Sequence, residues 1–183
     1  MTITSTRRNN IAGRQLIIGF CGPANSGKSL SAQYLVNKHR FARVPFAGPL
    51  KVMLAALGLT YDEIEYDLDG PCALLNGNTP AQAMQALRME WSRELINAWR
   101  ATVDRLPVGG AVVVEDCRSP NEANAIRALG GVLVRVNRAR AGIGQVNFTP
   151  DLYVENDGTP AELCDKLDSL VAGLVPARMR AAA

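Results

Sequence analysis

The chain has 183 residues, of which 48% are hydrophobic and 20% charged, and its formal net charge is +3. This length predicts one domain that folds without disulfides or metal, and the composition excludes the collagen-like, coiled-coil and disordered classes. No apolar run approaches the ~20 residues of a membrane span, and the polar start lacks the apolar segment of a secretory signal.

The basic excess lies at the two ends of the chain. Residues 1–14 contain three arginines and no acid, and residues 175–183 contain two arginines and no acid. The body between them has 15 basic and 17 acidic residues, a net charge of −2. Binding to nucleic acid or to a membrane surface would need a basic face on the folded body, so we expect neither partner. We expect residues 1–14 to form a disordered tail and residues 175–183 to form a second tail.

Apolar runs and helical spacings alternate along the body. Short apolar runs bounded by turns predict strands at residues 15–21, 41–45, 111–115, 131–136 and 152–155. Apolar residues at helical spacing predict helices at 29–39, 49–57, 80–105, 120–129 and from 160 onward, whereas the acidic stretch 60–70 is expected to be irregular. Strands that alternate with helices indicate an α/β fold with a parallel sheet covered on both faces. The apolar stripe of the helix at 80–105 is expected to contain Met84, Leu87, Trp91, Leu95 and Ala98.

Three helix starts share one pattern. Thr79, Ser119 and Thr159 are each followed by proline and, three residues on, by Gln or Glu. In such a capping box the hydroxyl accepts a hydrogen bond from the third helical amide, and the Gln or Glu side chain accepts one from the cap amide. Proline is favoured at the first helical position, because its missing N–H has no partner there. The pattern therefore predicts helices that begin at residues 80, 120 and 160.

The cysteines do not have the spacing of a metal site. Cys21, Cys72, Cys117 and Cys164 form no Cys-x-x-Cys pair, and the single histidine, His39, is far from all four in sequence. These cysteines and this histidine therefore do not have the spacing of zinc ligands. Cys21 and Cys117 lie in or beside apolar strands, so we expect them to be buried as small hydrophobic residues. Unpaired cysteines are typical of a reducing compartment, and we expect a cytoplasmic protein.

The segment after the first expected strand matches a phosphate-binding loop. Residues 22–29 read GPANSGKS, which fits the Walker A pattern G-x-x-x-x-G-K-[ST] between a strand and a helix. Backbone N–H groups of such a loop surround a phosphate, and the helix N-terminus adds partial positive charge. We expect Lys28 to bridge the β- and γ-phosphates of ATP and Ser29 to ligate Mg²⁺. The other residues expected to bind the nucleotide here are Gly22, Ala24, Asn25, Ser26 and Gly27.

A metal-binding carboxylate is expected where the strand at 111–115 ends. Proteins with this loop use an acidic residue at the end of a neighbouring strand to hold Mg²⁺, directly or through water. Asp116 is the first choice and Glu115 the second. The alternative is that Asp116 only forms a local ion pair with Arg118, and the two roles are compatible.

Five further segments read FAGPLK at 46–51, LNGNTP at 75–80, EWSR at 90–93, DCRSPNE at 116–122 and NDGT at 156–159. They resemble motifs of the deoxynucleoside monophosphate kinases found in tailed phages. The phosphate-binding loop is shared by many unrelated activities, whereas this combination, in this order over residues 15 to about 170, is far more specific. The resemblance implies a P-loop NTP hydrolase-like three-layer sandwich whose five parallel strands have the order 2-3-1-4-5.

The chain departs from the family pattern at three places. Ala81 stands where the family has arginine, Arg88 and Met89 stand where it has Gly-Thr, and residues 137–150 lack its histidine. Arg88 lies about two turns along the same expected helix as Ala81, so it is a candidate to replace the missing charge. Residues 137–150 are still the candidate lid, since glycines flank two arginines there.

Arginines on separate segments are the expected contacts for the transferred and accepting phosphates. An acceptor phosphate is already anionic, so transfer needs no general base and depends on positioning and charge neutralisation. Arginine suits bidentate phosphate contact. The expected catalytic residues are Lys28, Arg93, Arg118 and Arg138, with Arg140 as a further ATP contact and with Lys51, Arg88, Glu90, Trp91, Arg93 and Arg118 binding the acceptor. The alternatives are a Glu90–Arg93 pair on a solvated helix face and solvated positions for Lys51, Arg138 and Arg140.

These observations predict a nucleotide kinase that transfers the γ-phosphate of ATP, with Mg²⁺, to a deoxynucleoside monophosphate. We expect one kinase domain over residues 15–174, with a helical acceptor-binding insert at 46–105. The alternatives are another small-molecule P-loop kinase, similar to dephospho-coenzyme A kinase, and a nucleotide-binding module that has lost transfer. The expected partners are the two small-molecule substrates. A homodimer is left open, and a phage-encoded protein would act in the host cytoplasm.

Overall fold

The computed structural model describes residues 15–107, 109–141 and 146–181, so the expected tail at 1–14 and residues 142–145 of the candidate lid lie outside it. Five strands form one sheet in the order β2-β3-β1-β4-β5, and each neighbouring pair is parallel. The fold class and the strand order predicted from the sequence are therefore confirmed. The strands are β1 (Leu16–Cys21), β2 (Ala42–Arg43), β3 (Ala111–Val114), β4 (Val132–Asn137) and β5 (Leu152–Glu155).

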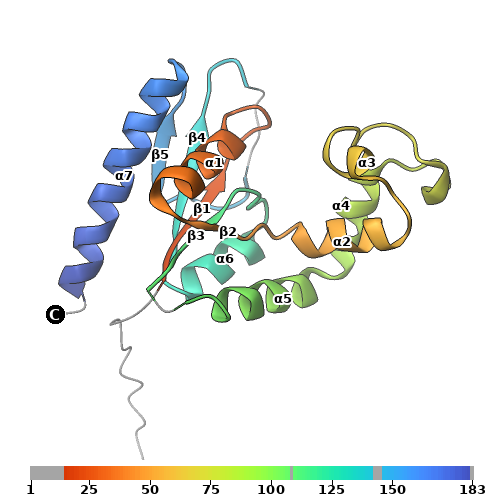
Figure 1. The fold of residues 1–183 in the computed structure, drawn as a ribbon, viewed down its shortest axis with the longest axis horizontal. Coiled ribbons are helices and arrows are strands. Elements are labelled where there is room, and N and C mark those ends of the chain that lie inside the picture. The colour runs from red at the N-terminus through yellow and green to blue at the C-terminus, as the bar shows by residue number, and fades with distance from the viewer. Residues whose placement is uncertain (1–14, 108, 142–145, 182–183) are drawn as a thin grey trace, which may run out of the picture.

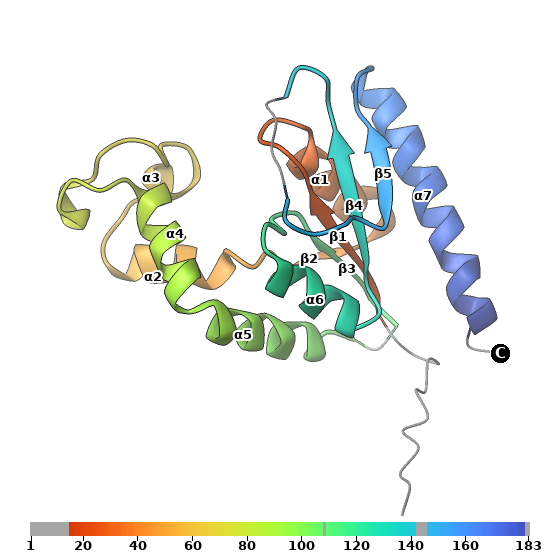
Figure 2. The ribbon, with the colours of Figure 1, turned by 180° about the vertical axis from the view of Figure 1, so that it is seen from behind.

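Helices cover both faces of the sheet and complete three layers (Figures 1 and 2). Successive side chains of a strand point to opposite faces, so Ile17 and Ile18 belong to different cores. Ile17 packs in a core with α5 (Ser92–Asp104) and α6 (Pro120–Ala128). Ile18 packs in a core with α1 (Lys28–His39) and α7 (Pro160–Ala181). Both faces are thus buried, as the continuous apolar strands predict.

A group of short helices projects from the side of the sheet (Figures 1 and 2). It has its own small core, in which Leu54, Leu59, Ile64 and Cys72 are buried against partly buried neighbours. We call residues 48–90 the arm, because they leave the sheet after β2 and return to it before α5. The arm contains α2 (Gly48–Ala56), α3 (Tyr61–Glu65), the 3₁₀ turn η1 (Ala73–Leu75) and α4 (Pro80–Glu90).

The single helix predicted over residues 80–105 is wrong, because the chain forms two helices that meet at Trp91. The backbone of Trp91 (φ −108°, ψ 25°) is not helical, and its side chain is 47% exposed instead of lying in an apolar stripe. Beyond this break, α5 buries Leu95, Trp99 and Val103, which lie four residues apart on one face. Helix α5 therefore belongs to a layer that packs on the sheet, whereas the acceptor-binding role expected for residues 46–105 stays a prediction.

All three predicted capping boxes are present. The cap hydroxyls of Thr79, Ser119 and Thr159 each accept from the third helical amide, and the Gln or Glu side chain accepts from the cap amide in return. A fourth box begins α3, where Thr60 and Glu63 make the same pair of bonds. The stretch expected to be irregular at 60–70 therefore contains a helix, and its Thr-x-x-Glu pattern was the signal for it.

Strand β2 and helix α7 differ in length from the expected elements, whereas Cys21 and Cys117 are buried as expected. Strand β2 is two residues long, shorter than the predicted 41–45, and α7 continues to Ala181, so most of the tail expected at 175–183 is helix. Cys21 and Cys117 are buried and unpaired, as predicted. Burial raises the pKa of the Cys21 thiol to about 11, so this thiol stays protonated at neutral pH.

A cluster of polar side chains joins α1 to α7. Asp168 on α7 lies 2.6 Å from the Lys38 Nζ, 2.7 Å from the His39 Nε2 and 3.0 Å from the Tyr34 hydroxyl. The hydrogen bonds from Lys38 and His39 hold the pKa of Asp168 at about 2, below its usual value of 3.8. Because the folded state prefers the ionised carboxylate, this cluster stabilises the fold above the ordinary carboxyl pKa.

We expect Asp168→Asn to lower the free energy of unfolding at pH 7, and the difference from wild type to shrink as the pH falls from about 4 to about 2. The depressed pKa in the folded state gives this sign, since the wild type loses the contribution when Asp168 is protonated. Urea unfolding between pH 2 and pH 7 measures it, with Asp165→Asn on the same helix as the control. A difference from wild type that does not depend on pH would contradict the assignment.

Candidate functional site

The loop between β1 and α1 is shaped by close packing at the carboxyl end of the sheet. Three of its residues have positive φ: Gly22 (130°), Asn25 (60°) and Gly27 (106°). A Cβ atom on Gly22 would lie 2.5 Å from the carbonyl oxygen of Val136 in β4. A Cβ atom on Gly27 would lie 2.3 Å from the Nδ2 of Asn156. Both glycines of the pattern are therefore required for two reasons. Each has a positive φ, and each is approached too closely for a Cβ, Gly22 by the β4 backbone and Gly27 by the buried Asn156 side chain.

Asn156 and Asp157 hold the loop from the side of β5. The Asn156 side chain is 6% exposed, and its Nδ2 donates to the carbonyl oxygen of Ser26 at 2.8 Å. The Oδ1 of Asp157 accepts from the backbone N–H of Ala139 at 2.6 Å. The pair thus connects the phosphate-binding loop with the segment after β4. The NDGT resemblance marked these residues, but sequence reasoning assigned them no role.

The side chain of Lys28 lies across the phosphate-binding loop. Its Nζ donates to the carbonyl oxygens of Gly22 at 3.0 Å and Pro23 at 2.5 Å. Burial, followed by the positive charge of Arg118, lowers the pKa of Lys28. Ser26 is fully buried, and among the described residues its hydroxyl has no hydrogen-bond partner. The loop residues expected to bind nucleotide therefore come together, and Ala24, Asn25 and Ser29 are exposed.

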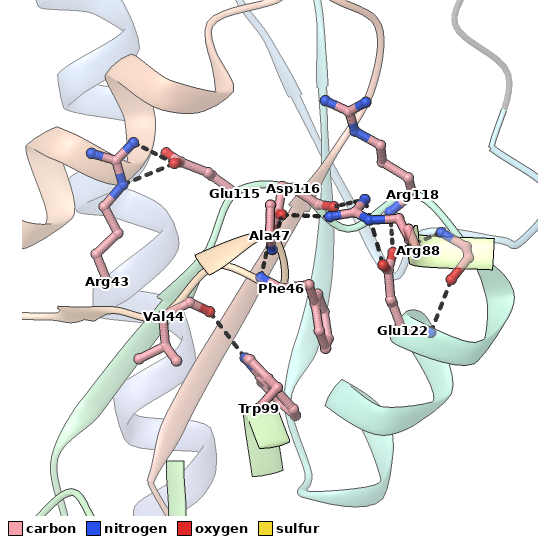
Figure 3. A network of polar contacts seen from close by, with 11 residues as sticks. Arg43, Val44, Phe46, Ala47, Arg88, Trp99, Glu115, Asp116, Arg118 and Glu122 are labelled. Carbon is pink, nitrogen blue, oxygen red and sulfur yellow. Dashed lines mark hydrogen bonds and ion pairs between the residues drawn. The ribbon is translucent and has the colours of Figure 1, made fainter. Parts of the chain in front are cut away.

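The two carboxylates after β3 have different surroundings (Figure 3). Oε1 of Glu115 accepts from Arg43, whereas its Oε2 is buried and has no hydrogen-bond partner among the described residues. The negative charge of Glu115 also raises the pKa of Lys28, although burial outweighs it. Asp116 accepts from the backbone N–H groups of Phe46 at 2.9 Å and Ala47 at 2.8 Å.

Arg88 provides a third donor to Asp116, and this changes the expectation for the metal. The Arg88 Nη2 lies 2.8 Å from Oδ2 of Asp116, so the ion partner of Asp116 is Arg88 rather than Arg118. Oδ2 of Asp116 thus accepts from two donors and Oδ1 from one, so Asp116 is a poorer direct ligand than expected, and its role in holding Mg²⁺ through water stays a prediction. Among the described residues, Oε2 of Glu115, the second choice, has no hydrogen-bond partner and is the better candidate for direct contact.

Magnesium that arrives with a nucleotide needs few protein ligands, because phosphates and waters complete its octahedral shell. The described residues contain no group of three or more His, Cys, Asp or Glu side chains able to hold a metal by themselves. One buried carboxylate oxygen on Glu115 and the exposed hydroxyl of Ser29 are a donor set of the size that such a shared site requires.

The predicted arginines divide into two groups. Arg118 is exposed beyond β3, close enough to Lys28 for its charge to lower the Lys28 pKa. Its backbone N–H donates to Oε2 of Glu122 at 2.8 Å. Arg138 and Arg140 are exposed after β4, which neighbours β1. These three arginines follow strands at the carboxyl end of the sheet, where the loop also lies.

Arg93 and Lys51 lie elsewhere. Arg93 lines a groove of about 710 Å³ together with Glu90 and Asn121, and the residues of this groove come from 89–100 and from α6. None of the residues that line this groove belongs to the phosphate-binding loop, and the acceptor role of Arg93 stays a prediction. Lys51 is paired with Glu65 at 2.5 Å inside the arm, and Trp91 lies at the junction of α4 and α5.

Comparison with known proteins finds one curated relative and a set of solved structures with a similar fold. No family model matches the chain. The chain is 28% identical over 143 residues, 67% of its length and 74% of the relative, to a protein of Acanthamoeba polyphaga mimivirus that carries the provisional name deoxynucleotide monophosphate kinase.

Solved structures support the same fold. An APS kinase (CysC) of Mycobacterium tuberculosis superposes with a TM-score of 0.52 at 18% identity, covering 87% of this chain and 98% of that one. The shikimate kinase of Aquifex aeolicus superposes with a TM-score of 0.52 at 12% identity and the same coverage. At these identities the likeness shows a shared fold. Within the described part of the chain, no helix has the length and apolar character needed to cross a membrane.

We expect Asn156→Ala to destabilise the protein by about 1–3 kcal/mol, because the buried carbonyl of Ser26 loses its donor. Urea unfolding measures the change. The matched control is Asn124→Ala on the exposed face of α6, which should change stability by less than about 0.5 kcal/mol. Equal effects of the two substitutions would show that Asn156 does not support the loop.

Proposed function

We propose that this protein is an ATP-dependent nucleotide kinase whose acceptor is a deoxynucleoside monophosphate. One observation carries the proposal: the loop at 22–29, which matches the Walker A pattern, lies between β1 and α1 at the carboxyl end of a sheet with the 2-3-1-4-5 order. The mimivirus relative and the motifs shared with the tailed-phage kinases support a nucleotide monophosphate as the acceptor. The kinase domain proposed is residues 15–174, with the arm as the acceptor-binding part.

The loop supplies the ATP phosphates with positive charge. Its backbone N–H groups and the N-terminus of α1 attract the phosphates. Lys28, which now donates to Gly22 and Pro23, would exchange these carbonyls for β- and γ-phosphate oxygens. Its lowered pKa follows from burial, and a bound polyanion would favour the ammonium form.

Ser29 and Glu115 are the residues that would hold Mg²⁺. Ser29 follows Lys28 on α1, and among the described residues the buried Oε2 of Glu115 has no hydrogen-bond partner. A Mg²⁺ ion held there would supply positive charge to the phosphates of the nucleotide. Arg43 pairs with the other oxygen of Glu115 and so orients the carboxylate.

Transfer to an acceptor phosphate requires positioning and charge compensation rather than a base. Arg118, which is exposed beyond β3 and whose charge acts on Lys28, is the arginine that we assign to the transferred phosphoryl group. Arg138 and Arg140 follow β4 and would add positive charge over the nucleotide. The acceptor would contact the segment from Phe46 to Lys51, which resembles the FAGPLK-type motif of the tailed-phage kinases and leads from β2 into α2.

The proposal is tested by incubating the protein with ATP, Mg²⁺ and each common ribo- and deoxyribonucleoside monophosphate. Chromatography should detect ADP and a diphosphate in equal amounts, with a deoxynucleotide as the preferred acceptor. Dephospho-coenzyme A is included as an acceptor of the alternative class. Phosphorylation of that compound alone, or ATP binding without any product, would overturn the proposal.

Lys28→Ala should lower kcat/KM by at least about 10²–10³, because a charge aimed at the transferred group is lost. Its stability should change by less than about 1 kcal/mol, since the lysine donates only to two carbonyls of its own loop. Lys166→Ala is the matched control, because Lys166 also donates to a backbone carbonyl, that of Glu155. Turnover of Lys28→Ala within tenfold of wild type would remove Lys28 from the mechanism.

Arg118→Ala should lower kcat by about 10²–10³ while ATP affinity changes little, if the guanidinium contacts the group in transfer. Arg118→Lys should lose less, since lysine keeps the charge but not the planar fork. Steady-state kinetics and ATP titration measure the two effects. The control is Arg105→Ala, an exposed arginine after α5. Full activity of Arg118→Ala would exclude this contact.

A further inference from the structure

The arm joins the body through two connections that converge on one carboxylate (Figure 3). The outgoing connection contains Phe46 and Ala47, whose backbone N–H groups donate to Oδ1 and Oδ2 of Asp116. The returning connection is the end of α4, where Arg88 donates to Oδ2 of Asp116 at 2.8 Å. Asp116 follows β3 in the body. One side chain of the sheet therefore binds both ends of the arm.

The charge of Arg88 is satisfied by this arrangement. Its Nη1 lies 3.3 Å from the backbone oxygen of Asp116 and 3.5 Å from Oε1 of Glu122. The side chains of Arg88, Asp116 and Glu122 are 19%, 12% and 5% exposed. A buried ion pair that loses one partner leaves an uncompensated charge. It would therefore be unfavourable for Arg88 to leave Asp116 and bind a ligand instead. The sequence assigned Arg88 to the acceptor, whereas its contacts bind the arm to the body.

The arm has a small apolar core of its own. The core of the arm contains Leu54, Leu59, Ile64 and Cys72 with partly buried neighbours, all of which belong to residues 48–90. The arm is therefore a unit with its own core, separate from the two cores of the sheet. A unit of this kind turns about its connections unless something fixes them.

We propose that Asp116 and Arg88 form a clasp that sets the orientation of the arm relative to the phosphate-binding loop. Arg88 is then a positioning residue for the acceptor, and Asp116 is a positioning residue rather than a metal ligand. The effect on the acceptor rests on the proposed function. The clasp itself does not, because its contacts belong to the protein alone.

Amide hydrogen exchange tests the clasp without any substrate. In Asp116→Asn the amides of Phe46 and Ala47 should exchange at least about tenfold faster than in wild type, since neither keeps a charged acceptor. The amide of Val44, which donates to the Val113 oxygen, is the internal reference and should not change. Unchanged exchange of Phe46 and Ala47 would overturn the clasp.

A matched control exists at the opposite end of the sheet. Asp151 also accepts from an arginine, Arg127 at 2.9 Å, and from a backbone N–H, that of Leu133 at 2.8 Å. Asp151→Asn makes the same chemical change away from the arm and should leave the amides of Phe46 and Ala47 at their wild-type rates. Accelerated exchange of these amides in Asp151→Asn would show general loosening and would overturn a specific clasp.

Kinetics separate positioning from metal binding and from direct acceptor contact. Asp116→Asn and Arg88→Gln should each raise the KM of the acceptor about tenfold or more, with ATP affinity and the Mg²⁺ requirement unchanged, and the double variant should resemble either single one. A raised Mg²⁺ requirement in Asp116→Asn would identify a metal ligand and overturn the proposal. So would a raised acceptor KM in Arg88→Gln alone, with Asp116→Asn normal in kinetics and exchange.

A milder variant keeps the test decisive if Asp116→Asn does not fold. Arg88→Lys keeps the charge at the clasp but loses the planar fork, so it should accelerate exchange of Ala47 by less than Arg88→Gln does. Equal exchange in wild type, Arg88→Lys and Arg88→Gln would overturn the clasp. If the wild type phosphorylates no nucleotide, the proposed function fails, and the exchange rates still decide for or against the clasp.

Discussion

The site depends on a backbone approach that leaves no room for side chains. The loop after β1 lies against the end of β4, where a Cβ on Gly22 would be 2.5 Å from the Val136 oxygen. On its other side Asn156, which follows β5, would collide with any Cβ on Gly27 and instead donates to Ser26. Because β4 and β5 set these neighbours, the strand order places the loop as much as its own sequence does. The positive charge of Lys28 lies at the carboxyl end of the sheet only when the loop has this shape.

The second constraint is the alternation of side chains at the end of β3. Val113 packs in the core of α1 and Val114 in the core of α5 and α6. Glu115 and Asp116 follow the strand, and their carboxylates have different partners. Oε1 of Glu115 accepts from Arg43, and among the described residues its buried Oε2 has no hydrogen-bond partner. The two oxygens of Asp116 accept from Phe46, Ala47 and Arg88.

Local patterns predicted the parts of the fold that depend on neighbouring residues. The strands, the three proline-containing capping boxes and the glycines of the loop follow from spacings of a few residues, and all are present. The break at Trp91 was missed because helical periodicity continues across it, and only packing of Trp99 on Phe46, with ring centroids 4.6 Å apart, shows which face is buried. The partner of Asp116 was also missed, because Arg88 is 28 residues away in sequence and a nearer arginine, Arg118, was available.

The arm and the sheet therefore meet through polar contacts of defined length rather than through a common apolar core. Apolar burial is non-directional, and it would tolerate small rotations of the arm. Hydrogen bonds from Phe46, Ala47 and Arg88 to one carboxylate are directional, and a rotation of the arm would stretch all three together. A kinase that transfers a phosphoryl group between two bound substrates needs this kind of constraint, because a misplacement of about 1 Å costs about 10²-fold in rate. In our proposal, the carboxylate that the sequence suggested as a metal ligand holds the arm in register with the phosphate-binding loop.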